Sequence, residues 1–303
     1  MYPVLQFTCA FTSAFHTSEN NYSNLYTCAP YILGTTLRGA VLRALIDTDC
    51  SGQQLQNQPT FHNHCDPTCQ VKPLFEPPTR FSFGTFLPES AGALRTRLGI
   101  DRERYSAAEG ALLSTEVRYG QFTFSVMFPY EGLQDAIYRA VEWAGSRPDS
   151  GGIGRFRSIG WGRFTLASKP APLTPPRLKA GHTQYRFCFC TPYVLDDQFI
   201  NEQQREHTLQ DQLRRALPAE LHDTVQVSAV ELRLRSLSYI RRWSDEPGHQ
   251  RKENRQVAGP DTELLVTFAQ PVAEEHLQVW QWGIGEWFDA GFGSCVIEPY
   301  PGR

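Results

Sequence analysis

The segment 151–164, GGIGRFRSIGWGRF, combines residue types that bind phosphates and bases. Glycines let the backbone approach a bulky ligand and adopt positive φ. Arginines bind phosphate in a bidentate fork, and aromatic rings offer stacking surfaces for bases. Together they favour a single-stranded nucleic acid over a nucleotide cofactor. The residues concerned are Gly151, Gly152, Gly154, Arg155, Phe156, Arg157, Gly160, Trp161, Gly162 and Arg163.

The net charge of the chain is only −3 over 303 residues, which argues against a uniformly basic nucleic-acid-binding protein. Its basic residues are nevertheless 25 arginines and 4 lysines. Arginine is the cation that recognises phosphates and bases, so a local basic face is one interpretation. A GC-rich genome that favours arginine codons explains the same bias equally well. The length and the 41% hydrophobic share allow two packed domains.

The N-terminal sequence MYPVLQFTCAF has an apolar run but no basic region and no small-residue cleavage site. We therefore expect a first strand there instead of a signal peptide. No apolar run approaches the roughly 18 residues that a membrane-spanning helix needs. We expect a cytoplasmic protein with no membrane partner. In that reducing compartment its eight cysteines favour metal binding or burial over disulfides.

A second group of chemistry-bearing residues lies in the irregular segment 47–92. Two cysteines there are spaced C-x3-C, with two histidines just before them. Zinc binds four nitrogen or sulfur ligands, and such a metal would order a long loop. The candidate ligands of a structural zinc are Cys50, His62, Cys65 and Cys69. A polar insertion that happens to carry cysteines is an equal alternative, and no other cofactor is expected.

The predicted elements of the first half run strand, helix, strands, helix, strand, which is the split βαβ pattern of a ferredoxin-like domain. The strands are expected at 4–11, 94–105, 111–117, 121–128 and 163–166, and the helices after Thr35 or Thr36 and at 133–143. Residues 12–30 and 47–92 are expected to be irregular. The turn at Gly34 leads into a helix N-terminus, which is also an anion site, but a capped helix with solvated arginines gives the same pattern.

After a proline-rich linker at 168–182 the pattern begins again. Strands are expected at 185–191, 225–239, 263–268 and 294–298, helices at 197–217 and 272–282, and a charged loop at 241–259. The second half also ends in a helix, a glycine loop at 283–293 and a short strand; this loop lacks arginine and is explained by a tight turn without a ligand. The sequence thus predicts an α+β protein of two tandem ferredoxin-like domains, 1–168 with an insertion at about 47–92, and 183–303.

Three motifs of the first half resemble those of the RAMP superfamily of CRISPR effector subunits. Residues 32–39, ILGTTLRG, are similar to that family's PG-S/T-S/T-L-R-G motif, with Leu33 where proline is usual. Residues 97–116 resemble its R-x-x-I-D-R block, and residues 152–164 resemble its G-x-G-R-x-R-x-x-G-x-G-R loop. More loosely, Trp243, Gly259 and the loop 283–293 resemble the second half of the two-domain subunit of type III-D complexes.

The resemblance implies a non-catalytic subunit that binds crRNA and grips its 5′ repeat-derived handle. Such a subunit packs against the large subunit and a backbone subunit, and meets target RNA only indirectly. Asp101 is expected either at the strand end facing the RNA or in an ion pair with a nearby arginine. The residues that the resemblance implies for RNA binding are Gly34, Thr35, Thr36, Arg38, Arg43, Arg97, Arg102, Gly154, Arg155, Phe156, Arg157, Gly160, Trp161 and Arg163.

Two catalytic alternatives belong to the same superfamily. A guide-processing endoribonuclease needs a general base near a bound 2′-hydroxyl, and His16 is the candidate, although a lone loop histidine is usually only solvated. A backbone subunit that cuts target RNA is expected to carry an aspartate between the first strand and the first helix. Residues 12–36 contain Glu19 as their single acid, which argues against that role. A stand-alone ligand-binding protein whose glycine loops are only turns is a further alternative.

Overall fold

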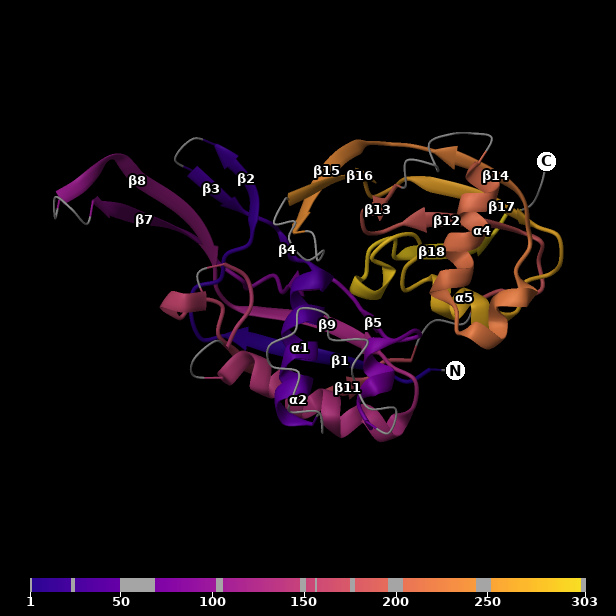
Figure 1. The fold of residues 1–303 in the computed structure, drawn as a ribbon, viewed down its shortest axis with the longest axis horizontal. Helices are drawn as coiled ribbons and strands as arrows, with labels where there is room; N and C mark the ends of the chain where they lie inside the picture. The colour runs from indigo at the N-terminus through magenta and orange to yellow at the C-terminus, as the bar shows by residue number, and fades with distance from the viewer. Residues whose placement is uncertain are drawn as a thin grey trace.

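A computed structural model of the protein describes residues 2–22, 25–49, 69–101, 106–147, 151–155, 157–174, 178–195, 204–243 and 252–300. Figure 1 shows two lobes side by side, with a long two-stranded hairpin extending from the first lobe. Each lobe holds one antiparallel sheet with helices on one face. Among the described residues no helix is both long and apolar enough to cross a membrane.

The first lobe has the ferredoxin-like order of elements. They are β1 (Val4–Phe11), α1 (Gly34–Thr48), β5 (Arg80–Phe81) with β6 (Gly84–Phe86), β9 (Gln121–Met127), α2 (Gln134–Ser146) and β10 (Phe164–Leu166). The sheet order is β10-β1-β9-β6, so the fourth and third core strands flank the first, and the pairs are antiparallel. β4 (Tyr31–Ile32) and β11 (Ala171–Pro172) extend this sheet at its margins.

The second lobe repeats that topology. Its elements are β12 (Gln184–Phe189), α4 (Arg205–Ala216), β14 (Val227–Arg233), β17 (Glu263–Phe268), α5 (Glu274–Trp280) and β18 (Cys295–Pro299). The sheet order is β14-β17-β12-β18, with antiparallel pairs throughout. The strand orders of both lobes confirm the predicted pair of tandem ferredoxin-like folds.

Each lobe inserts a hairpin between its second and third core strands. In the first lobe β7 (Gly92–Asp101) pairs with β8 (Ser106–Arg118), beside β2 (Ser18–Tyr22) and β3 (Leu25–Cys28). In the second lobe β15 (Leu237–Trp243) pairs with β16 (Lys252–Ala258), which also pairs with β13 (Tyr193–Val194). Single 3-10 turns complete the fold: η2 (Lys72–Phe75), η3 (Glu131–Leu133), η4 (Arg157–Ile159), η5 (Ala219–Thr224) and η6 (Phe288–Ala290).

Several sequence expectations were wrong at these insertions. The alternating segment 94–105 was expected to form a core strand, but among the described residues β7 pairs with β8 alone, outside the core sheet. The second core strand is instead the short pair β5 and β6, inside the segment expected to be irregular. Strands β2, β3 and β16 replace predicted loops at 12–30 and 241–259. Periodicity does not reveal them, because β2 and β16 are mostly polar and β3 has only four residues.

The two lobes meet along an apolar seam formed largely by the second glycine loop. Its buried members are Val194, Val257, Ala290 and Phe292, and Leu33, Phe83 and Trp287 pack against them. The turn η6 lies against the first turn of α1, where a Cβ built on Gly34 would stand 1.8 Å from the carbonyl oxygen of Ala290. Arg38 forms an ion pair with Asp289 at 2.9 Å across the same seam. Arg38 is therefore not the solvated arginine that the amphipathic pattern suggested.

A buried cation reinforces the seam. Arg80 is 0% exposed, and its Nη2 donates to the carbonyl of Ala216, the last residue of α4. Its Nη1 donates to the carbonyl of Thr79 at 3.0 Å, and its Cζ lies 4.2 Å from the ring centroid of Phe288. Burial lowers the pKa of Arg80 to about 9, although Asp289 opposes the shift. The carbonyl end of α4 stabilises this cation because the helix dipole is negative there.

The seam predicts opposite effects for two glycines of one helix. Gly34→Ala drives a methyl group into the Ala290 carbonyl, so we expect it to lower the free energy of unfolding by about 1–3 kcal/mol. Gly39→Ala is the matched control because nothing lies within 4 Å of its Cβ position. Alanine there raises stability by about 0.5–1 kcal/mol through its helix propensity. Denaturant unfolding of both variants checks the pair, and equal effects would contradict this seam.

Candidate nucleic-acid interface

The first glycine loop, residues 151–163, is held in a fixed frame by its glycines. Gly154 and Gly162 have φ of 85° and 75°, in the left-handed region that favours glycine. A Cβ on Gly162 would lie 1.8 Å from the carbonyl oxygen of Ile153, whose amide donates to the Gly162 carbonyl at 3.0 Å. The Gly162 amide donates to Ala14 at 2.7 Å, which fastens the loop to the segment leaving β1.

The second glycine loop, residues 283–293, repeats this frame. Gly283, Gly285, Gly291 and Gly293 have the same spacing as Gly152, Gly154, Gly160 and Gly162, and all eight have positive φ. A Cβ on Gly293 would lie 2.1 Å from the carbonyl oxygen of Ile284, whose amide donates to the Gly293 carbonyl at 3.3 Å. The Gly293 amide donates to Pro192 at 2.9 Å, just after β12. The predicted repeat of the two halves therefore includes the individual hydrogen bonds of their glycine loops.

The two loops differ in their side chains and in what covers them. Aligned on their glycines, Arg155, Arg157 and Arg163 correspond to Glu286, Phe288 and Ser294. The tip of the second loop, η6, is packed into the lobe seam. The sequence explained this loop by a tight turn without a ligand, and the structure adds that the loop joins the two lobes. The second loop also shows that the frame forms without arginines.

The arginines of the first loop lie outside the frame's own packing. Arg155 and Arg157 are exposed, while Arg163 and Trp161 are half-buried beside them. The Arg155 amide donates to the His16 carbonyl at 2.8 Å, and the Arg163 amide donates to the Ser13 hydroxyl at 2.9 Å. These contacts fix the backbone of Arg155 and Arg163, while the side chains of Arg155 and Arg157 are exposed. Phe156 lies outside the described residues.

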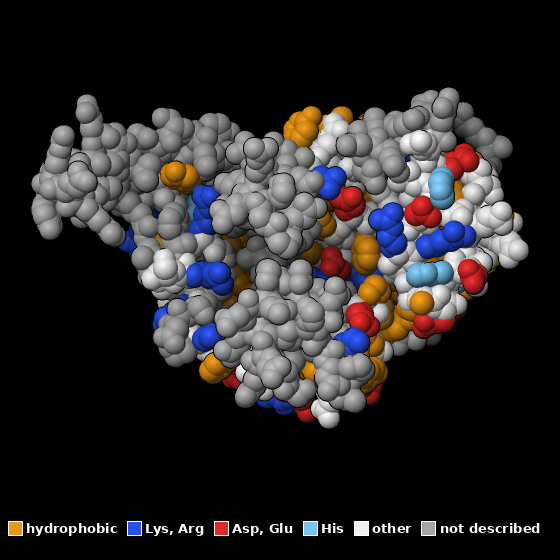
Figure 2. Space-filling model, viewed as in Figure 1, with side chains coloured by type: hydrophobic (Ala, Val, Ile, Leu, Met, Phe, Trp, Pro, Cys, Tyr) orange, Lys and Arg blue, Asp and Glu red, His pale blue; other side chains and the backbone are white. Residues whose placement is uncertain are grey.

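Two further arginines stand at the base of the β7–β8 hairpin, next to this loop. The backbone of Arg118 bonds with that of Phe15 in both directions, and its guanidinium lies 5.1 Å from the ring centroid of Phe86. Arg95 donates from Nη2 to the Tyr119 hydroxyl at 2.8 Å. Sequence reasoning did not select either residue, because neither belongs to a motif. In Figure 2 the left part of the described surface, towards that hairpin, shows mainly blue basic side chains, whereas red ones gather further right and below.

The remaining predicted RNA-binding residues are not brought to one place. Thr35 and Thr36 lie in the first turn of α1 with Gly34 and Arg38, which the seam covers. Arg43 pairs with Asp47 at 3.4 Å on the same helix, and Asp47 also pairs with Arg147 at the end of α2. Arg97 and Asp101 belong to β7, and Arg102 lies outside the described residues. No comparison tests an RNA role for these residues, which stays a prediction.

The zinc hypothesis cannot be read from geometry, because Cys50, His62 and Cys65 lie outside the described residues. Cys69, which is described, is 5% exposed in the core of the first lobe. Within the described ranges no group of three or more His, Cys, Asp or Glu side chains is arranged to hold a metal ion. Structural zinc stays a prediction, to be checked by metal analysis of the purified chain, with about one zinc expected per chain.

His16 is a core residue and not the solvated loop histidine expected from the sequence. It is 0% exposed, and its Nδ1 donates to the Glu116 carbonyl at 2.7 Å. In the second lobe Val194 holds the corresponding position, since Ala14 and Pro192 receive equivalent glycine amides. Burial lowers the pKa of His16 as the main effect, the hydrogen bond to Glu116 opposes it, and the charge of Arg155 lowers it further.

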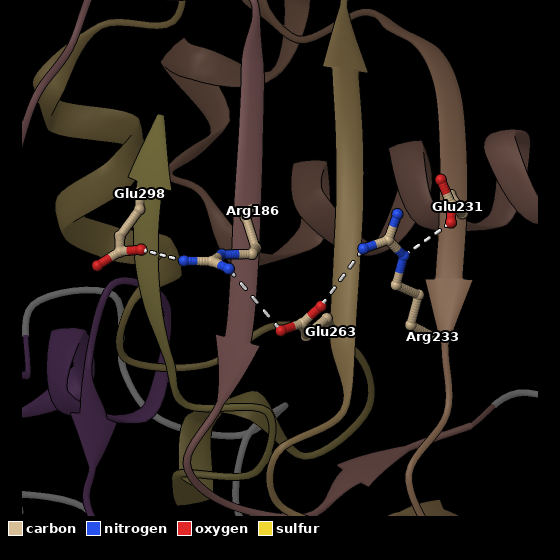
Figure 3. Close-up of polar contacts among 5 residues, drawn as sticks. All are labelled: Arg186, Glu231, Arg233, Glu263 and Glu298. Atoms are coloured by element: carbon tan, nitrogen blue, oxygen red, sulfur yellow. Dashed lines mark hydrogen bonds and ion pairs between the residues drawn. The ribbon is translucent and has the colours of Figure 1, made fainter. Parts of the chain in front are cut away.

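The open face of the second sheet carries a self-paired charge network, drawn in Figure 3. Arg186 bridges Glu298 at 2.6 Å and Glu263 at 4.0 Å, while Arg233 bridges Glu231 at 2.7 Å and Glu263 at 3.8 Å. Three carboxylates thus surround two guanidinium groups on four neighbouring strands. This excess of negative charge disfavours contact with a phosphate backbone. The face therefore differs from the stacking platforms by which many single-strand binders use a sheet.

Comparison with protein families connects this geometry to a known group. Residues 18–165 match the model of the RAMP superfamily, a range that runs from β2 through the first glycine loop to β10. The first lobe therefore belongs to the RAMP superfamily. Comparison with curated proteins gives no match.

Among solved structures, the chain is similar to a CRISPR-associated protein Cas6, with 11% identity, a TM-score of 0.45, and coverage of 99% of this chain and 100% of that one. It is similar to a Cas6-related protein from Pyrococcus furiosus, with 11% identity, a TM-score of 0.46 and 98% of each chain covered. A chain of the type III-B Cmr-beta complex bound to cognate target RNA has 13% identity and a TM-score of 0.39, over 57% of this chain and 61% of that one. The fold assignment rests on the strand orders of the two lobes.

Burial of His16 predicts a pH dependence of stability. Because the folded pKa is lowered, the unfolded chain takes up a proton first as the pH falls through about 6.5. The stability contribution is therefore complete above that pH and is lost below it. We expect the drop in thermal midpoint from about pH 7.5 to about pH 5.5 to be smaller in His16→Asn than in the wild type. An identical drop in both proteins would contradict the assignment of His16 as a buried neutral histidine.

Proposed function

We propose that the protein is a non-catalytic crRNA-binding subunit of a type III CRISPR effector complex, most closely of the III-D kind, acting in the cytoplasm. Its first glycine loop grips the 5′ repeat-derived handle of the guide, and the chain packs against the large subunit and a backbone RAMP subunit. The observation that carries the proposal is the pair of glycine loops. The two loops share one backbone conformation. The tip of the second loop is buried between the lobes, whereas the first loop exposes Arg155 and Arg157.

The binding chemistry follows from that exposure. Two backbone hydrogen bonds fix the loop at these arginines: the Arg155 amide donates to the His16 carbonyl, and the Gly160 amide donates to the Arg157 carbonyl. The backbone positions from which the two side chains extend are therefore defined. Guanidinium groups pair with phosphates, and the half-buried Trp161 offers a ring beside them. Arg118 and Arg95, at the base of the β7–β8 hairpin, extend the same basic surface. A single strand of RNA fits this site, because its bases are free to stack.

The absence of catalysis is part of the proposal, and two observations support it. A general base must come within hydrogen-bond reach of the hydroxyl that it deprotonates. His16 is fully buried with its Nδ1 committed to Glu116, so it does not reach a bound 2′-hydroxyl. The segment between β1 and α1 offers Glu19 in place of the aspartate expected of a target-cutting subunit.

Removal of two loop arginines should weaken RNA retention. We expect Arg155→Ala/Arg157→Ala to release crRNA at lower salt than the wild type and to flatten the plot of log affinity against log salt by about 0.7 for each phosphate that the variant no longer binds. Arg139→Ala/Arg215→Ala removes the same charge from exposed positions on α2 and α4 and serves as the matched control. The measurement is a filter-binding series over salt concentration. A slope equal to that of the control would remove this loop from the RNA site.

The nuclease alternative makes a separate prediction. We expect His16→Ala to leave the length of the co-purifying guide unchanged, because a buried histidine takes no part in cleavage. Gel analysis of the RNA extracted from wild type and variant gives the comparison, after thermal unfolding has shown that the variant is folded. Accumulation of an unprocessed precursor would instead identify an endoribonuclease. Sequencing the extracted RNA from its 5′ end tests for the handle.

A further inference from the structure

Exposed apolar side chains are concentrated at the start of the second hairpin. Leu234, Leu237 and Tyr239 are 43%, 50% and 71% exposed, and they lie within six residues of each other. Other large exposed apolar residues, such as Leu94, Trp143 and Val296, are spread over different elements. Single exposed apolar residues need no explanation, but a cluster marks an interaction surface.

The cluster lies at the edge of a sheet. β15 pairs with β16 on one side, in the order β13-β16-β15, and within the described ranges no strand pairs with its other side. Figure 1 shows β15 and β16 along the upper margin of the molecule. Side chains alternate between the two faces of a strand, so Leu237 and Tyr239 share one face.

The charge of this hairpin selects the kind of partner. Residues 234–258 contain six basic residues against three acidic ones, in a chain whose net charge is −3. Within 234–243 there are three arginines and no acid, and Arg235, just before β15, is exposed. Edge-to-edge pairing with a second copy would bring like charges together, which is unfavourable. A polyanion is favoured, and an exposed tyrosine ring with arginines on both sides in sequence suits one with free bases.

We propose that the face of β15 bearing Leu237 and Tyr239, next to the exposed Arg235, is a second RNA-binding surface that takes an unpaired strand with a base stacked on Tyr239. This surface rests on the proposed function but is separate from the glycine loop in the first lobe. The sheet of the same lobe is a poorer candidate for RNA binding, because its open face carries the self-paired charges of Figure 3. In the second lobe RNA then meets the hairpin edge and not the sheet.

Fluorescence anisotropy with a short fluorescein-labelled oligouridylate tests the proposal on the full chain freed of bound RNA. We expect Tyr239→Ser to weaken binding about tenfold, because one base–aromatic stack is removed. Tyr239→Phe keeps the ring and should bind as the wild type does. Tyr130→Ser, which removes a 50% exposed tyrosine from the turn before α2, is the matched control and should have no effect. All four proteins should share one thermal midpoint, since the altered side chains are exposed.

The variants separate this inference from the proposed function. If Tyr239→Ser binds normally while Arg155→Ala/Arg157→Ala binds weakly, the second surface is overturned and the glycine-loop function stands. If neither variant weakens binding, both are overturned. A Tyr239→Phe variant as weak as Tyr239→Ser overturns the stacking contact. If Tyr239→Ser binds RNA normally but loses a protein that co-purifies with the wild type, the RNA proposal is overturned, and the occupant of this surface is an acidic protein strand.

Discussion

The rest of the structure depends on a steric constraint that is met twice. In each lobe one glycine, Gly162 or Gly293, lies so close to the carbonyl of an isoleucine in the same loop that no side chain fits. The same glycine donates its amide to the segment leaving the first core strand. Loop, first strand and closing strand are thereby fixed together. The side chains at the tip of the loop can then differ between the lobes, because the glycine contacts that fix the loop do not involve them.

That freedom explains how one repeated element takes two roles. In the second lobe the tip carries Glu286 and Asp289 beside apolar residues, and it fills the seam against Gly34 while Asp289 binds Arg38. The tip of the first lobe carries Arg155 and Arg157 and stays exposed. Arg80 anchors the seam from the other side by binding the carbonyl end of α4. The two lobes are thus held in one arrangement, which gives the two proposed RNA-binding surfaces a fixed relation to each other.

The sequence predicts the larger pattern well and the pairings poorly. Alternation of strand and helix patterns is enough to predict two ferredoxin-like folds, and the glycine spacing reveals the repeat. Strands β2 and β16 were missed because they are polar, and β5 and β6 because they are too short to show a period. The ion pair of Arg38 with Asp289 was not foreseen, because Asp289 lies in the other lobe and no local pattern indicates a contact so distant in sequence. His16 was misplaced for a similar reason, since its burial comes from Glu116 and the first glycine loop.

The central claim is that the two glycine loops share one backbone conformation but have different roles: the first binds RNA and the second joins the lobes. Ultraviolet crosslinking of the protein to its co-purified RNA, followed by mass spectrometry of the peptides, tests it most directly. The account predicts crosslinked nucleotides on peptides from 151–163 and none on peptides from 283–293. Crosslinks to the second loop, or to both loops equally, would contradict it.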